Sequence, residues 1–63
     1  MIRAVLFYED EDDLVQTEDV WAVSLDDADN YFKSFLDQHL GAFIHITYYN
    51  VEDETITFKV GNL

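Results

Sequence analysis

The densest group of ionisable side chains in the sequence is a run of five acidic residues, Glu9, Asp10, Glu11, Asp12 and Asp13. An extended chain rises about 3.3 Å per residue, close to the roughly 3.4 Å spacing of phosphates along one DNA strand. Such a run can imitate the charge density of a nucleic-acid backbone and attract a basic protein. The alternative is that the run is only a solvated turn, since the tip of a hairpin is polar in any case.

The whole chain is acidic, with fourteen carboxylates against three basic side chains and a formal net charge of −11. So few basic residues argue against direct binding of nucleic acid and favour a basic, nucleic-acid-acting protein as the partner. Like charge at this density also destabilises a small domain by self-repulsion, so the acidity alternatively serves solubility or a high-salt cytoplasm. The acids expected to bind the partner are the run and three further carboxylates, Glu18, Asp19 and Asp26.

The spacing of the acids does not match a metal site. A calcium loop needs a glycine at its sharp turn and a closing glutamate, whereas Leu14 directly follows the acidic run. Asp26, Asp27 and Asp29 resemble an aspartate-rich magnesium motif, but the capping bond and the dipole of a helix beginning there explain them better. We therefore predict no metal site.

The sequence contains few side chains of the kinds that act in catalysis. The sequence has two histidines, His39 and His45, and no cysteine, so a zinc site would need carboxylates as ligands. No glycine-rich phosphate loop and no nucleophile motif is present. We predict that the protein is not an enzyme and needs no cofactor.

One helix is predicted over residues 25–40. Ser24 is suited to accept the backbone N–H of Asp27 as the N-cap, and Gly41 is suited to end the helix in a left-handed conformation. Apolar residues follow at spacings of three and four, which is the pattern of an amphipathic helix: Leu25, Ala28, Phe32, Phe35, Leu36 and Leu40.

Strands are predicted on both sides of this helix. Residues 2–8 and 18–24 form a first hairpin, whose second strand extends toward residue 14 and whose tip is the acidic run. Residues 42–50 and 55–60 form a second hairpin around a polar turn. The expected architecture is a single α+β domain over residues 1–63, a ββαββ fold with an antiparallel four-stranded sheet and one helix on one face.

The other face of that sheet is expected to be uncovered and partly aromatic. Strict alternation along residues 42–50 places Phe43, His45 and Tyr49 there, which makes this face a candidate interface with a second copy or with another protein. A chain of 63 residues without disulfides has a marginal core, so we expect a homodimer. No apolar run approaches a membrane span and no leader opens the chain, so we expect a cytoplasmic protein.

The segment 21–28 (WAVSLDDA), followed by a helix and by Gly41, Ala42 and Phe43 at the start of a strand, resembles a known family. The family comprises the small ββαβ inhibitors of bacterial RNA polymerase made by short-tailed coliphages, and the similarity covers about residues 2–50. In that family an acidic strip and arginines on the strand after the helix contact the polymerase, and Thr47 and Tyr49 stand where those arginines are expected. The resemblance implies a small, acidic, phage-type protein that binds and modulates a host protein. The alternative is a structural or dimeric regulatory module without enzymatic activity.

Overall fold

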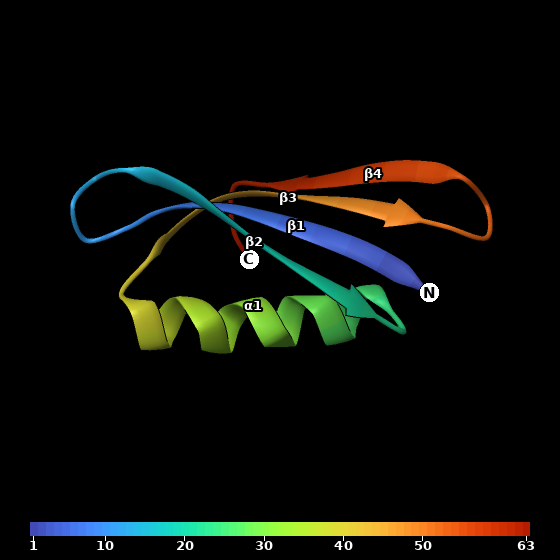
Figure 1. Cartoon of the computed structure of the whole chain (residues 1–63), viewed down its shortest axis with the longest axis horizontal. Helices are drawn as coiled ribbons and strands as arrows, with labels where there is room; N and C mark the ends of the chain where they lie inside the picture. The colour runs from blue at the N-terminus through green and yellow to red at the C-terminus, as the bar shows by residue number, and fades with distance from the viewer.

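A computed structural model describes residues 1–63 and shows one four-stranded antiparallel sheet with a single helix beside it (Figure 1). The elements are β1 (Ile2–Glu9), β2 (Val15–Ala22), α1 (Leu25–His39), β3 (Ala42–Asn50) and β4 (Thr55–Val60). Their order across the sheet is β2-β1-β3-β4, so α1 connects two strands that flank β1. The α+β class and the ββαββ order predicted from the sequence are confirmed.

The second strand begins three residues earlier than the pattern of residues 18–24 indicates and ends at Ala22. It pairs with β1 without interruption, from Ile2 opposite Ala22 to Glu9 opposite Val15. The three added residues are Val15, Gln16 and Thr17, two of which are β-branched and favour a strand. The central strand β1 offers them a complete row of backbone partners, so pairing extends β2 to Val15.

The start of α1 is as predicted, and its end differs. The Ser24 hydroxyl accepts the backbone N–H of Asp27 at 3.2 Å. At the other end the left-handed residue is Leu40, with φ 50° and ψ 36°, rather than Gly41. Gly41 is needed for space, because a Cβ atom there would lie 2.8 Å from Leu36 Cδ2 and 2.9 Å from Tyr8 Cδ2.

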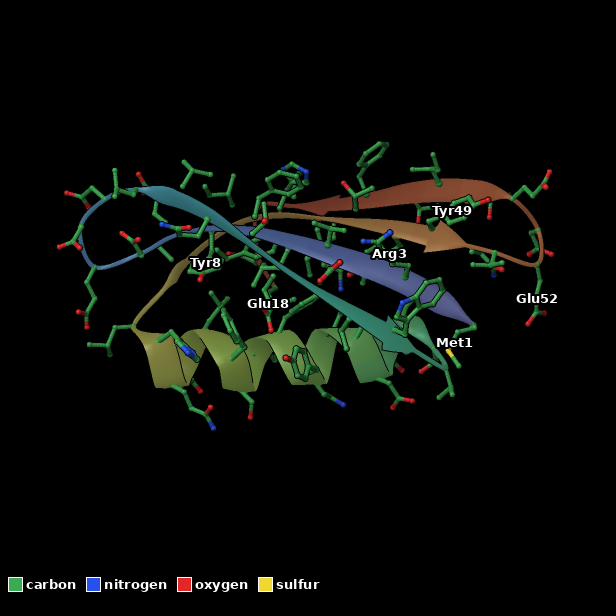
Figure 2. The ribbon with its side chains drawn as sticks, in the orientation of Figure 1. Met1, Arg3, Tyr8, Glu18, Tyr49 and Glu52 are labelled. Carbon is green, nitrogen blue, oxygen red and sulfur yellow. The ribbon has the colours of Figure 1, made fainter.

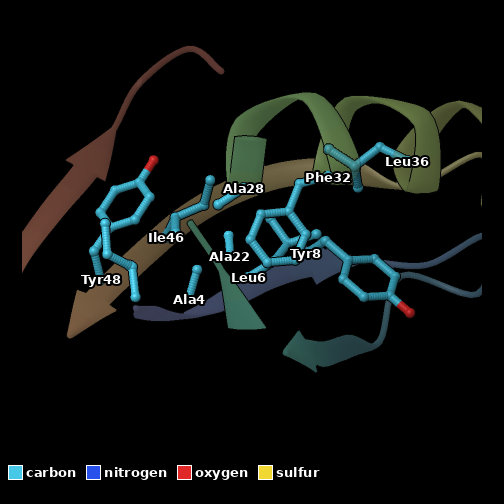
Figure 3. Close-up of a cluster of buried hydrophobic side chains, with 10 residues drawn as sticks. Ala4, Leu6, Tyr8, Ala22, Ala28, Phe32, Leu36, Ile46 and Tyr48 are labelled. Carbon is cyan, nitrogen blue, oxygen red and sulfur yellow. The ribbon is translucent and has the colours of Figure 1, made fainter. Parts of the chain in front are cut away.

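The core lies between α1 and one face of the sheet (Figure 3). The helix packs on β1, β2 and β3 and leaves β4 uncovered. The largest fully buried side chains of the core are Phe32, Leu6 and Ile46. The ten buried apolar residues of the core are Ile2, Ala4, Leu6, Tyr8, Ala22, Ala28, Phe32, Leu36, Ile46 and Tyr48.

Phe43 does not lie on the uncovered face as predicted, because β3 contains a bulge. Phe7 pairs with His45, but the next residue, Tyr8, pairs with Phe43, so Ile44 is an extra residue in β3. The extra residue reverses the alternation beyond this point. Phe43 consequently packs against the core on the helix side and is not part of the uncovered face.

Candidate partner-binding surface

The acidic run forms the tip of the β1–β2 hairpin, but as a turn and not as an extended ribbon. Glu9 is the last residue of β1, and Asp13 adopts a left-handed conformation with φ 62°. The Asp13 backbone N–H donates to the Asp10 carbonyl oxygen at 3.0 Å, which closes the turn. The carboxylates of the tip therefore do not follow the strand spacing on which the comparison with DNA phosphates rests.

Asp10 is directed inward and holds the turn together. Its carboxylate accepts the backbone N–H groups of Asp12 at 2.9 Å and Leu14 at 3.0 Å, and the Gln16 side-chain amide at 2.9 Å. The Gln16 hydrogen bond is the main cause that lowers the pKa of Asp10, with the two backbone donors adding to it. Asp10 has a structural function, which leaves Glu9, Glu11, Asp12 and Asp13 as the outward-facing acids of the tip.

Glu18 and Asp19 are neighbours in sequence but lie on opposite faces of the sheet. Glu18 lies between β2 and the helix, where the Tyr31 hydroxyl donates to it at 2.7 Å (Figure 2). This hydrogen bond raises the pKa of Tyr31. Asp19 lies on the side away from the helix and forms an ion pair with Arg3 at 2.7 Å. A flat partner surface docked on one face of the sheet would contact only one of these two carboxylates.

Asp26 is exposed in the first turn of α1, where a negative charge is favoured by the helix dipole. This places Asp26 at the end of the molecule that also holds the β3–β4 turn, with Asp53 and Glu54. The tip of the first hairpin lies at the opposite end of the longest dimension, which is 37 Å (Figure 1). The expected acidic surface is thus divided between the two ends of the molecule.

The open face is the side of the sheet away from α1. His45 and Tyr49 lie on it, as predicted: the His45 ring stacks on Phe7 with centroids 4.4 Å apart, and Tyr49 is opposite Arg3 and Ile56. Arg3 also lies over the Trp21 ring, 6.0 Å from its centroid. By register the open face comprises Arg3, Val5, Phe7, Glu9, Val15, Thr17, Asp19, Trp21, Ala42, His45, Thr47, Tyr49, Ile56, Phe58 and Val60.

Two groups of residues were not predicted from the sequence. One is a polar cluster on the helix side, in which the Asp29 carboxylate accepts hydrogen bonds from the Tyr48 hydroxyl and the Lys59 ammonium. The pKa of Tyr48 is raised mainly by burial and, to a lesser extent, by its hydrogen bond to Asp29. The other is the β4 stripe, defined as Ile56, Phe58 and Val60, which is exposed on the open face. The alternation of residues 55–60 separates these side chains from Lys59, but only the pairing with β3 shows which side faces the helix.

Shallow hollows are present on the surface. The hollow that adjoins the acidic tip has a volume of about 340 Å³ and is lined by Tyr8, Asp10, Glu11, Asp12, Gln38 and His39. His39 donates through Nδ1 to the Phe35 carbonyl oxygen at 2.9 Å and stacks on the Phe35 ring. No three histidine or carboxylate side chains converge in a way that would hold a metal ion.

The helix does not have the length and apolar character needed to cross a membrane. Comparison of the chain with protein-family models, with curated proteins and with solved structures finds no match. The function is therefore argued from the geometry and the charges of the chain itself.

Proposed function

We propose that the protein is a small binding protein without enzymatic activity that docks on a basic, nucleic-acid-binding protein and occupies its nucleic-acid site. The observation that carries the proposal is the lack of internal charge compensation. Only three of the fourteen carboxylates form ion pairs, Asp19, Asp29 and Glu52, which leaves eleven without a cationic partner in the chain. These charges raise the free energy of the isolated domain by mutual repulsion, and a cationic surface would lower it.

The arrangement favours contact through two acidic ends. At one end Glu11, Asp12 and Asp13 project from the hairpin tip, and at the other Asp53 and Glu54 project from the β3–β4 turn. The 37 Å between the extremes corresponds to about eleven base-pair steps of roughly 3.4 Å. A groove that holds a short duplex would accept a body of this length with a cluster of carboxylates toward each end.

The expected mechanism is competitive inhibition. The field of the acids steers the encounter with the basic partner, and the docked protein then excludes nucleic acid from the same groove. In the setting that the phage-type resemblance implies, the partner is a host protein and the encounter takes place in the host cytoplasm. Binding of this kind weakens steeply when salt is added, because exposed charges are screened.

The test is affinity capture from a bacterial lysate on the immobilised protein, with elution in steps of salt. We expect retained proteins that are basic, that elute between about 50 and 200 mM salt, and that short duplex DNA displaces. Retention that does not change over this salt range, or that DNA does not reduce, would contradict charge mimicry.

Two variants with the same charge change locate the contact. The first, Glu11→Gln/Asp12→Asn, neutralises the tip and leaves Asp10 to hold the turn. The second, Asp53→Asn/Glu54→Gln, neutralises two charges at the opposite end. If both ends contact the partner, each variant elutes at lower salt than the wild type. If net charge alone retains the partner, the two variants and any third double neutralisation elute together.

A dimeric module whose acidity serves solubility is the second candidate function. The exposed apolar residues of the open face favour it, since they are the part of the surface that the acidic mimic does not use. A homodimer is compatible with either function.

A further inference from the structure

The apolar side chains of the outer strand β4 lie on the face of the sheet away from the helix, where an isolated domain would expose them to solvent. Ile56, Phe58 and Val60 point away from the helix and are 58%, 66% and 72% exposed. Thr57 and Lys59 point to the helix side, opposite the core residues Tyr48 and Ile46. In a sheet with one solvated face the apolar side chains normally point to the core, so β4 shows the reverse pattern.

This orientation is fixed by specific contacts. Lys59 reaches the helix side and forms an ion pair with the buried carboxylate of Asp29. A shift of one residue would turn Phe58 toward the helix and carry Lys59 to the other face, because side chains alternate along a strand. The Asp29 carboxylate would then lose its cationic partner inside the protein. The exposure of the β4 stripe is therefore a specified feature of the fold.

The stripe is part of a larger apolar patch on the β3–β4 half of the open face. Tyr49 lies beside Ile56, Thr47 beside Phe58 and His45 beside Val60. Given about 150–250 Å² for a large side chain, the exposed fractions amount to roughly 400 Å². Contiguous patches of this size on small soluble proteins are often functional.

We infer that the β3–β4 half of the open face is a homodimer interface, in which a second copy of the chain packs its own β4 stripe against this one. Two copies would remove about 800 Å² of apolar surface from water. Since homodimer interfaces are about 65% apolar, the total buried area would be roughly 1,200 Å², within the range of stable interfaces.

The charge distribution favours a second copy over the basic partner proposed above. The charged residues among the paired rows of the open face are Arg3, Asp19 and Glu9, all on the β1–β2 half, where Arg3 and Asp19 neutralise each other. The apolar half has no carboxylate to attract a basic protein and none to repel another copy. Face-to-face packing centred on β4 leaves the ion pair at the rim, where it stays hydrated.

The inference does not depend on the proposed function. A symmetric dimer uses the same patch on both copies, so a change at one position acts twice. In such a dimer the acidic ends of both copies remain outside the interface and available to a partner. Added salt should strengthen self-association, because it screens the repulsion between two acidic chains, and should weaken docking on a basic protein. Because added salt affects self-association and docking in opposite directions, the two proposals can be tested, and can fail, independently.

The test compares Phe58→Asp with Thr57→Asp by sedimentation equilibrium over a wide range of protein concentration. Both variants add one carboxylate to β4, on opposite faces of the strand. We expect a dimeric wild type, a dissociation constant raised at least about 30-fold in Phe58→Asp, and little change in Thr57→Asp. A wild type that stays monomeric in both dilute and molar salt overturns the inference, as does a Phe58→Asp variant that dimerises like the wild type.

A measurement on the unaltered sequence covers the case in which a variant does not fold. In an equal mixture of isotope-labelled and unlabelled protein, intermolecular nuclear Overhauser effects should connect the side chains of the β4 stripe in one copy to those in the other. Intermolecular effects confined to other surfaces would show that a dimer forms elsewhere and would refute this interface.

Discussion

The Asp29 carboxylate on α1 accepts the hydroxyl hydrogen of Tyr48 on β3, beneath the only helix of the fold. The same carboxylate forms an ion pair with Lys59, although α1 does not pack on β4. One buried acid thus links the helix to the outer strand and sets which side of that strand faces the core. The contact determines the exposure of the apolar stripe on the opposite side.

Replacement of Asp29 by alanine should destabilise the domain by about 2–3 kcal/mol. The change leaves the buried hydroxyl of Tyr48 without its acceptor and Lys59 without its partner. The estimate lies below the cost of breaking a fully buried pair, because Lys59 is partly exposed and can turn to solvent. For a domain of this size the expected fall in Tm is roughly 10–20 °C.

Thermal and urea unfolding of three variants measure this effect. Asp29→Asn keeps an acceptor for Tyr48 and should lie between the wild type and Asp29→Ala. Asp26→Ala removes an exposed carboxylate of the first helical turn and should cost less than about 1 kcal/mol. Equal stability of the Asp29→Ala and Asp26→Ala variants would show that the buried cluster does not stabilise the fold.

Tyr48 should make the folded protein sensitive to alkali. Burial and the Asp29 carboxylate raise the pKa of Tyr48 above the ordinary tyrosine value of 10.0, so the folded state keeps a proton that the unfolded state releases. The stabilisation is complete below pH 10 and is lost progressively as the pH rises further. Absorbance of ionised tyrosine should show Tyr48 among the last of the four tyrosines to titrate, and Tyr48→Phe should reduce the dependence of stability on pH above 10.

The fold was predictable wherever the local pattern and the tertiary contacts agree. The Ser24 cap, the apolar spacing of the helix and the alternating strands each correspond to an element of the structure. The errors have tertiary causes. Strict alternation placed Phe43 on the open face, and a bulge opposite Phe7 and Tyr8 returned it to the core. In the sequence, Asp29 looks like a further acidic residue at the start of a helix. Only its contact with Lys59, thirty residues later, shows the function of Asp29.

Gln16 should control the titration of Asp10. Its amide donates the hydrogen bond that lowers the pKa of Asp10 most, so Gln16→Ala should raise that pKa toward the ordinary aspartate value of 3.8. A depressed pKa stabilises the turn above pH 3.8, and this contribution is lost as the pH falls through the folded value. Carboxyl carbon shifts followed by NMR give the pKa directly. Thr17→Ala, on the opposite face of β2, is the control and should leave it unchanged.

The sequence indicates which acidic residues belong to the candidate site, but it does not show how they are arranged in space. The sequence indicates that Glu9 to Asp13 are exposed at a hairpin tip, but not that Asp10 turns inward to close the tip. Glu18 and Asp19 read as one acidic pair, whereas the pleat separates them onto opposite faces of the sheet. Charge can be counted from a sequence, but the direction of each carboxylate depends on pairing partners far along the chain.

Substitution of Leu40 by glycine should stabilise the protein. Leu40 ends α1 at φ 50° and ψ 36°, a conformation that costs a residue with a Cβ atom roughly 1–2 kcal/mol and glycine little. The side chain is 71% exposed, so its removal loses little apolar burial. Glycine also makes the unfolded chain more flexible, which offsets part of the gain, and the expected net increase in unfolding free energy is about 0.5–1 kcal/mol.

The matched comparison is Gly41→Ala at the next position. There the added Cβ would meet the side chains of Leu36 and Tyr8, both buried, so overpacking should lower the unfolding free energy by about 1–3 kcal/mol. Urea unfolding of the two variants should therefore give changes of opposite sign at adjacent residues. A destabilised Leu40→Gly together with a destabilised Gly41→Ala would mean that Gly41, and not Leu40, adopts the left-handed conformation at the end of the helix.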